Sequence, residues 1–114
     1  MKRAGRKEYR KVAPAILKGI VASVVQAARP DKIILFGSAA RGQLGPNSDV
    51  DLLVIKSGRF SRTRLINKIY MGLDEAGEPV DIVIVTPEEV EEYRDCPYLV
   101  IYPALREGKV VYVA

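Results

Sequence analysis

A short apolar run that stops at a glycine, with a pair of acids ten residues after the turn, most constrains how this chain can fold. Ile33–Phe36 is typical of a buried strand, and Gly37-Ser38 directly after it predicts a tight turn. Glycine lets the backbone approach a ligand closely, and Ser38 adds a hydroxyl group. We expect Ala39–Arg41 to begin a helix whose positive end faces the same spot. The turn therefore predicts a place for a phosphate group.

Two aspartates open the next strand-like segment. Asp49 and Asp51 begin Asp49–Ile55, a stretch of apolar and β-branched residues. Side chains alternate along a strand, so both carboxylates should project to one side, about 7 Å apart along the chain. Two anions at the mouth of an apolar strand repel each other unless a cation lies between them. Hard oxygen ligands suit Mg²⁺, and we predict a magnesium site here.

A third aspartate occupies the corresponding place in a later strand-like run, Pro79–Val85. If the two acidic strands are neighbours, Asp81 completes a triad with Asp49 and Asp51. Such a triad could hold two metal ions for an in-line displacement at phosphorus, and Asp81 could also act as a general base. We predict these three aspartates to be both catalytic and metal-binding.

Each of these motifs has a plainer explanation. Asp49 and Asp51 could simply end a strand at the surface, and Gly-Ser turns are common. Arg41 lies one turn after Ser38, where it could reach a phosphate with two N–H groups, pair with a carboxylate or lie in solvent. The combination of turn, spacing and three acids favours a nucleotide and metal site. We therefore assign Gly37, Ser38 and Arg41 to nucleotide binding.

The remaining chain alternates helix-like and strand-like segments without an internal repeat. Apolar spacing and capping residues predict helices over 14–28, 62–75 and 98–107, a further helix starting at Thr86-Pro87, and strands near 33, 50, 80 and 110. These segments lack the regular rhythm of an all-parallel doubly wound fold. We predict an α/β fold with a mixed β-sheet and flanking helices.

Charge is concentrated at the N-terminus. Residues 1–11 hold six Lys or Arg against Glu8, whereas the net charge of all 114 residues is +4. We predict a basic tail over 1–11 and a single domain over 12–114. The tail could touch RNA, but a short basic end is more often solvated, and we do not expect nucleic-acid binding.

Composition excludes several classes of protein. No apolar run approaches the ~20 residues that span a bilayer, so we expect no membrane insertion. A single cysteine, Cys96, cannot form an internal disulfide, which favours a cytoplasmic location. The chain has no histidine, which excludes Ser-His-Asp hydrolysis and histidine zinc sites. What remains is chemistry based on carboxylates and metal ions.

The chain resembles the polymerase β superfamily of nucleotidyltransferases, and most closely its minimal, MNT-type members. The resemblance rests on Gly37-Ser38, the ten-residue spacer, Asp49-Val50-Asp51 and Asp81, and it covers about 31 to 85. Gln43 departs from the pattern, because members often carry an acid after the residue equivalent to Gly42.

This resemblance implies a polymerase β-like nucleotidyltransferase core that uses two Mg²⁺ ions and ATP. Members of this kind are antitoxins that transfer AMP to a tyrosine of a partner HEPN-domain toxin, with which they can form a hetero-oligomer. A non-catalytic binding protein that neutralises its partner by steric contact is the alternative. Transfer to a small acceptor such as an aminoglycoside would need a sizeable acceptor domain, which we do not find in the sequence.

Overall fold

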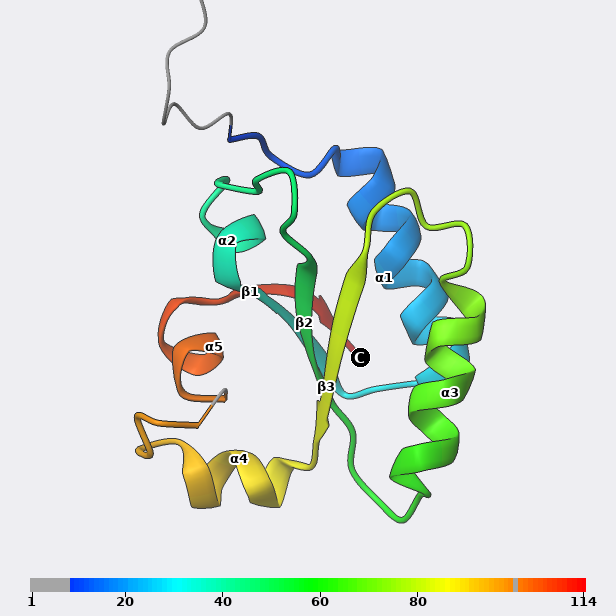
Figure 1. Cartoon of the computed structure of the whole chain (residues 1–114). Helices are drawn as coiled ribbons and strands as arrows, with labels where there is room; N and C mark the ends of the chain where they lie inside the picture. The colour runs from blue at the N-terminus through cyan, green and yellow to red at the C-terminus, as the bar shows by residue number, and fades with distance from the viewer. Residues whose placement is uncertain (1–8, 100) are drawn as a thin grey trace, which may run out of the picture.

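The computed structural model describes residues 9–99 and 101–114, which form one sheet with helices on both faces (Figure 1). The elements in chain order are α1 (Pro14–Ala28), β1 (Lys32–Phe36), α2 (Gly37–Ala40), β2 (Val50–Ile55), α3 (Arg62–Gly72), β3 (Val80–Val85), α4 (Pro87–Tyr93), α5 (Ile101–Glu107) and β4 (Lys109–Val113). The predicted α/β fold is confirmed.

The sheet has the strand order β3-β2-β1-β4 and is mixed, as predicted. β1 runs antiparallel to β2 and to β4, whereas β2 and β3 are parallel. The end of β1 therefore lies beside the beginning of β2, and Phe36 pairs with Asp51. Asp51 in turn pairs with Asp81 across β2 and β3. One end of the sheet thus collects the turn after β1 and the beginnings of the two strands β2 and β3. We call this end of the sheet the acidic edge.

Alternation along the strands divides the core between the two faces of the sheet. One face packs Ile33, Leu52 and Ile84 against α1 and α3, while the opposite face packs Ile34 and Leu53 against α5. Figure 1 shows α1 and α3 on one side of the sheet and α4 and α5 on the other. Because β2 is buried on both faces, Asp51 is carried on a rigid central strand.

The helices match the sequence predictions most closely where their ends are marked. α1 spans 14–28 as predicted and stops at Arg29, whose φ of 47° is left-handed. α3 ends at Gly72, short of the predicted 75, because the N–H of Leu73 bonds to the carbonyl of Tyr70 and closes a tighter turn. Residues 98 and 99 were predicted helical but lie in a turn and a bend, where the N–H of Leu99 bonds to the carbonyl of Cys96. Residue 100 of the same predicted helix lies outside the described residues.

The basic N-terminal stretch is described only from Tyr9 onward, so residues 1–8 of the predicted tail lie outside the described residues. The backbone of Arg10 pairs with Leu44 by two hydrogen bonds, and its guanidinium group lies 2.6 Å from Glu78. The division into a tail over 1–11 and a domain over 12–114 stays a prediction. Within 9–99 and 101–114, no helix has both the length and the apolar character needed to cross a membrane.

Candidate functional site

The turn after β1 is a single helical turn that starts at its glycine. α2 covers Gly37–Ala40, two residues earlier than the predicted start at Ala39, and Arg41 follows as its C-cap. The carbonyl of Ser38 accepts hydrogen bonds from the N–H groups of Arg41 and Gln43 at 3.1 and 2.9 Å, which close the turn. A helix this short has little dipole, so a phosphate here would depend on individual N–H groups.

Gly37 lies directly against a carboxylate of the neighbouring strand. It follows Phe36, the partner of Asp51 in the sheet, and it has a φ of +73°. A Cβ atom added at Gly37 would overlap the Oδ2 atom of Asp51. Glycine is therefore required both for the backbone conformation and for the approach of Asp51. This contact joins the predicted phosphate turn to the predicted metal site.

The three aspartates gather at the acidic edge, although Asp49 does not lie on a strand. Asp51 is half-buried in β2 opposite the exposed Asp81 of β3, whereas Asp49 is exposed and precedes β2 by one residue. Burial, followed by the charges of Asp81 and Asp49, raises the pKa of Asp51 to about 6. Negative charge at this edge is thus poorly compensated by the protein itself.

These carboxylates fit a divalent cation that binds together with a substrate. Among residues 9–99 and 101–114, no three Asp, Glu, Cys or His side chains converge into a ready-made metal cluster. Mg²⁺ does not require one, since it commonly takes one or two carboxylates and completes its shell with phosphate oxygens and water. Asp51 and Asp81 supply hard oxygen ligands at paired positions. A cation would offset the burial and the repulsion by Asp81 and Asp49 that raise the pKa of Asp51.

Arg41 extends from α2 toward neighbours other than the aspartates. Its Nη1 atom lies 4.0 Å from Oε1 of Glu107, and its Nε donates to Oε1 of Gln43 at 3.4 Å. Both contacts are long and exposed, so they stabilise this orientation by little. Arg41 could therefore turn toward a phosphate at low cost.

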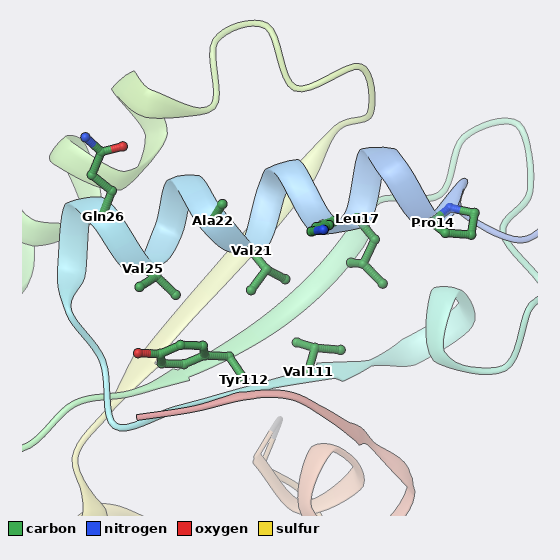
Figure 2. Close-up of a pocket in the computed structure, with 9 residues that line it drawn as sticks. Pro14, Leu17, Val21, Ala22, Val25, Gln26, Val111 and Tyr112 are labelled. Carbon is green, nitrogen blue, oxygen red and sulfur yellow. The ribbon is translucent and has the colours of Figure 1, made fainter.

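The described residues also form an apolar groove away from the acidic edge. It lies between α1 and β4, with a volume of about 580 Å³ (Figure 2). Leu17, Val21 and Val25 face Val111 and Tyr112 across it, and none of the described residues that line it is acidic. In the sheet, β1 and β2 separate β4 from Asp81, so this groove is not part of the acidic site.

One residue beside the acids, Tyr70 of α3, was not singled out from the sequence. Its hydroxyl accepts a hydrogen bond from the N–H of Ile82 at 2.9 Å and lies 3.5 Å from Oδ1 of Asp81. The available signal was weak. A tyrosine at the end of an amphipathic helix needs a partner for its hydroxyl, but the sequence does not say which one.

Comparison with known proteins decides the family. A family model described as "Nucleotidyltransferase domain" matches residues 17–108, which include the turn and all three aspartates. The chain belongs to this family. Nucleotidyltransferase domains generally use a nucleoside triphosphate and a divalent metal ion, in agreement with the character of the acidic edge.

Two solved structures share the fold of this nucleotidyltransferase domain. Both are crystal structures of mutants of the toxin-antitoxin MntA-HpeT. The first is 20% identical with a TM-score of 0.54, and the alignment covers 82% of this chain and 71% of that one. The second is 17% identical with a TM-score of 0.58, covering 85% of this chain and 72% of that one. No protein of curated function matches the chain in sequence.

Proposed function

We propose that this nucleotidyltransferase domain transfers AMP from ATP, with Mg²⁺, to a tyrosine hydroxyl of a partner HEPN-domain toxin and so acts as an antitoxin. The observation that carries the transferase part is the pairing of Asp51 with Asp81, with Gly37 packed against the Asp51 carboxylate. The antitoxin part is supported by the shared fold with MntA-HpeT, which is described as a toxin-antitoxin.

The residues have the following roles in this proposal. Asp49, Asp51 and Asp81 hold two metal ions, and Gly37 and Ser38 cradle the triphosphate through their backbone N–H groups. Arg41 turns from Glu107 to a phosphate. Magnesium supplies charge neutralisation of the phosphates and lowers the pKa of the attacking hydroxyl when it is bound.

The reaction is a substitution at phosphorus. The tyrosine oxygen forms a bond to the α-phosphorus of ATP, and the bond from that phosphorus to the bridging oxygen of the β-phosphate breaks. Pyrophosphate leaves, and the phenolic proton passes to a carboxylate. Asp81 is our candidate, through the carboxylate oxygen that does not face Tyr70, because its side chain is exposed. The cytoplasmic location predicted from the single cysteine stays a prediction.

Intact mass spectrometry tests this proposal directly. The proposed partner, taken as a HEPN-type protein encoded beside this gene, would be incubated with the chain, Mg²⁺ and each of the four nucleoside triphosphates in turn. We expect a gain of one or more AMP units with ATP, and none with Asp51→Asn. A stable complex without a mass gain would instead favour the non-catalytic, steric antitoxin.

The matched control for Asp51→Asn is Asp31→Asn. Asp31 precedes β1 and accepts a hydrogen bond from the N–H of Ser57 at 3.0 Å. It lies at the opposite end of β2 from Asp51, because the next residue, Lys32, pairs with Ile55. Asp31→Asn should retain transfer. Equal loss in the two variants would indicate general damage to the fold and contradict the assignment of Asp51.

A further inference from the structure

The hydroxyl of Tyr70 is held at the free edge of β3 by the backbone of that strand. The carbonyls of Pro79 and Val85 accept hydrogen bonds from Val50 and Lys56 on the β2 side. Because directions alternate along a strand, Ile82 and Ile84 turn their backbone groups to the free edge. The N–H of Ile82 donates to Tyr70 at 2.9 Å, so the edge strand is capped beside Asp81.

A second residue of α3 caps the same edge further along. Nη1 of Arg62 donates to the carbonyl of Ile84 at 3.0 Å and is also paired with Glu89. The first and last turns of α3 therefore both cover β3, and the helix is anchored across the strand at Arg62 and at Tyr70. This anchoring fixes the position of the Tyr70 hydroxyl along β3, next to Asp81.

The hydrogen bond from Ile82 decides what else the phenol can do. Once the Tyr70 oxygen accepts from this N–H, its own proton must be donated elsewhere. Oδ1 of Asp81 is the acceptor at 3.5 Å, longer than the about 2.5–3.0 Å of a formed O–H···O bond. Polar contacts in a site without its substrate are often long and tighten in the complex.

We infer that Tyr70 is a positioning residue for Asp81: its hydroxyl, aligned by the Ile82 N–H, donates to one carboxylate oxygen and leaves the other available to a divalent cation. This inference rests on the proposed function. It assigns to Tyr70 the role that hydrogen-bond partners of metal-binding carboxylates have in general, which is to orient the ligand. Tyr70 itself touches neither cation nor substrate.

Metal affinity is the primary test. Calorimetry would titrate Mg²⁺ into each protein in the presence of a non-hydrolysable ATP analogue. We expect Tyr70→Phe to weaken Mg²⁺ binding by about tenfold or more. The matched control is Tyr112→Phe, which removes the same oxygen from the groove beside β4 and should bind as the unmodified chain does.

A double-mutant cycle separates positioning from a general structural effect. In an Asp81→Asn background, Tyr70→Phe should cause little further loss of Mg²⁺ affinity, because the residue it orients has been changed. Equal losses in the two backgrounds would overturn the inference. So would a Tyr70→Phe variant that binds Mg²⁺ as tightly as Tyr112→Phe.

Amide hydrogen exchange supplies a readout that needs no metal. Loss of the Tyr70 oxygen should speed exchange at Ile82, while the amides of α1 stay protected. Unchanged exchange at Ile82 would contradict the hydrogen bond on which the inference depends. If the unmodified chain binds no Mg²⁺ with the analogue, the proposed function and this inference both fail. If it binds and only Asp81→Asn weakens binding, the inference alone fails.

Discussion

At the scale of single residues, Gly37 combines a left-handed backbone with a carboxylate packed over its Cα. We expect Gly37→Ala to destabilise the fold by about 1 kcal/mol through its φ of +73°. The new methyl group would also displace Asp51, and a displacement of that kind should lower transfer by roughly a hundredfold. Chemical denaturation and the mass-spectrometric transfer assay measure the two effects separately.

Gly58 is the matched control for Gly37. Its φ is +90°, yet apart from its chain neighbours none of the described residues has an atom within 4 Å of a Cβ added there. Gly58→Ala should therefore cost similar stability and leave transfer intact. Similar activities for the two variants would show that the contact between Gly37 and Asp51 is unimportant for the site.

The raised pKa of Asp51 gives the metal-free protein a pH-dependent stability. The pKa rises from 3.8 to about 6 on folding, so the unfolded chain ionises first as the pH increases. Folding stability is therefore lost between about pH 4 and 6, and the penalty is complete above pH 6. With chelator present, Asp51→Asn should stabilise the fold at pH 7 by about 1 kcal/mol, after discounting for solvent screening of this partly exposed group.

Denaturant unfolding at pH 7 and near pH 3.5 tests this sign. The advantage of Asp51→Asn should nearly vanish at the lower pH, where the carboxyl group of the unmodified chain is protonated in the folded state and mostly protonated in the unfolded state. A variant that is less stable at pH 7 without metal would contradict the electrostatic account of the site.

At the scale of elements, α4 begins with a reciprocal cap. The Thr86 hydroxyl accepts from the N–H of Glu89 at 3.1 Å, and the Glu89 carboxylate accepts from the N–H of Thr86 at 2.9 Å. Thr86→Ala should cost about 1 kcal/mol of unfolding free energy. Thr63→Ala, at an exposed position inside α3, should change stability far less. Thermal unfolding compares the two, and transfer should be unaffected in both because α4 follows the opposite end of β3 from Asp81.

The elements also show what sequence patterns can and cannot predict. Apolar runs located all four strands, and the acidic strand starts were visible because charges interrupt those runs. The start of α2 was missed because Gly37, whose φ is positive, was expected to form a tight turn before the helix and instead is its first residue. The contact of Tyr70 with β3 was also missed, because it depends on how α3 lies across the sheet rather than on any local pattern.

At the scale of the whole molecule, the strand order β3-β2-β1-β4 is what brings the site together. The sequence predicted that Asp81 would join the acidic pair only if the two strands were neighbours. The parallel register that pairs it with Asp51 is a tertiary property. Composition could not foresee that Asp49 would fall just outside β2, although its charge still contributes to the raised pKa of Asp51.

Because the site bridges β1, β2 and β3, ligand binding should stabilise the entire fold. A ligand that binds only the folded state adds about 2.7 kcal/mol at a concentration of one hundred times its dissociation constant. For a domain of this size, each kcal/mol raises the melting temperature by roughly 4 °C or more, so MgATP should raise it by about 10 °C.

Thermal scans with Mg²⁺ alone, ATP alone and both together measure this effect. The combination should exceed either component, because the carboxylates and phosphates share the cation. Asp51→Asn should lose the cooperative part of the shift while keeping its greater stability without metal. A shift of the same size in Asp51→Asn and the unmodified chain would place the nucleotide elsewhere than at the acidic edge of the sheet.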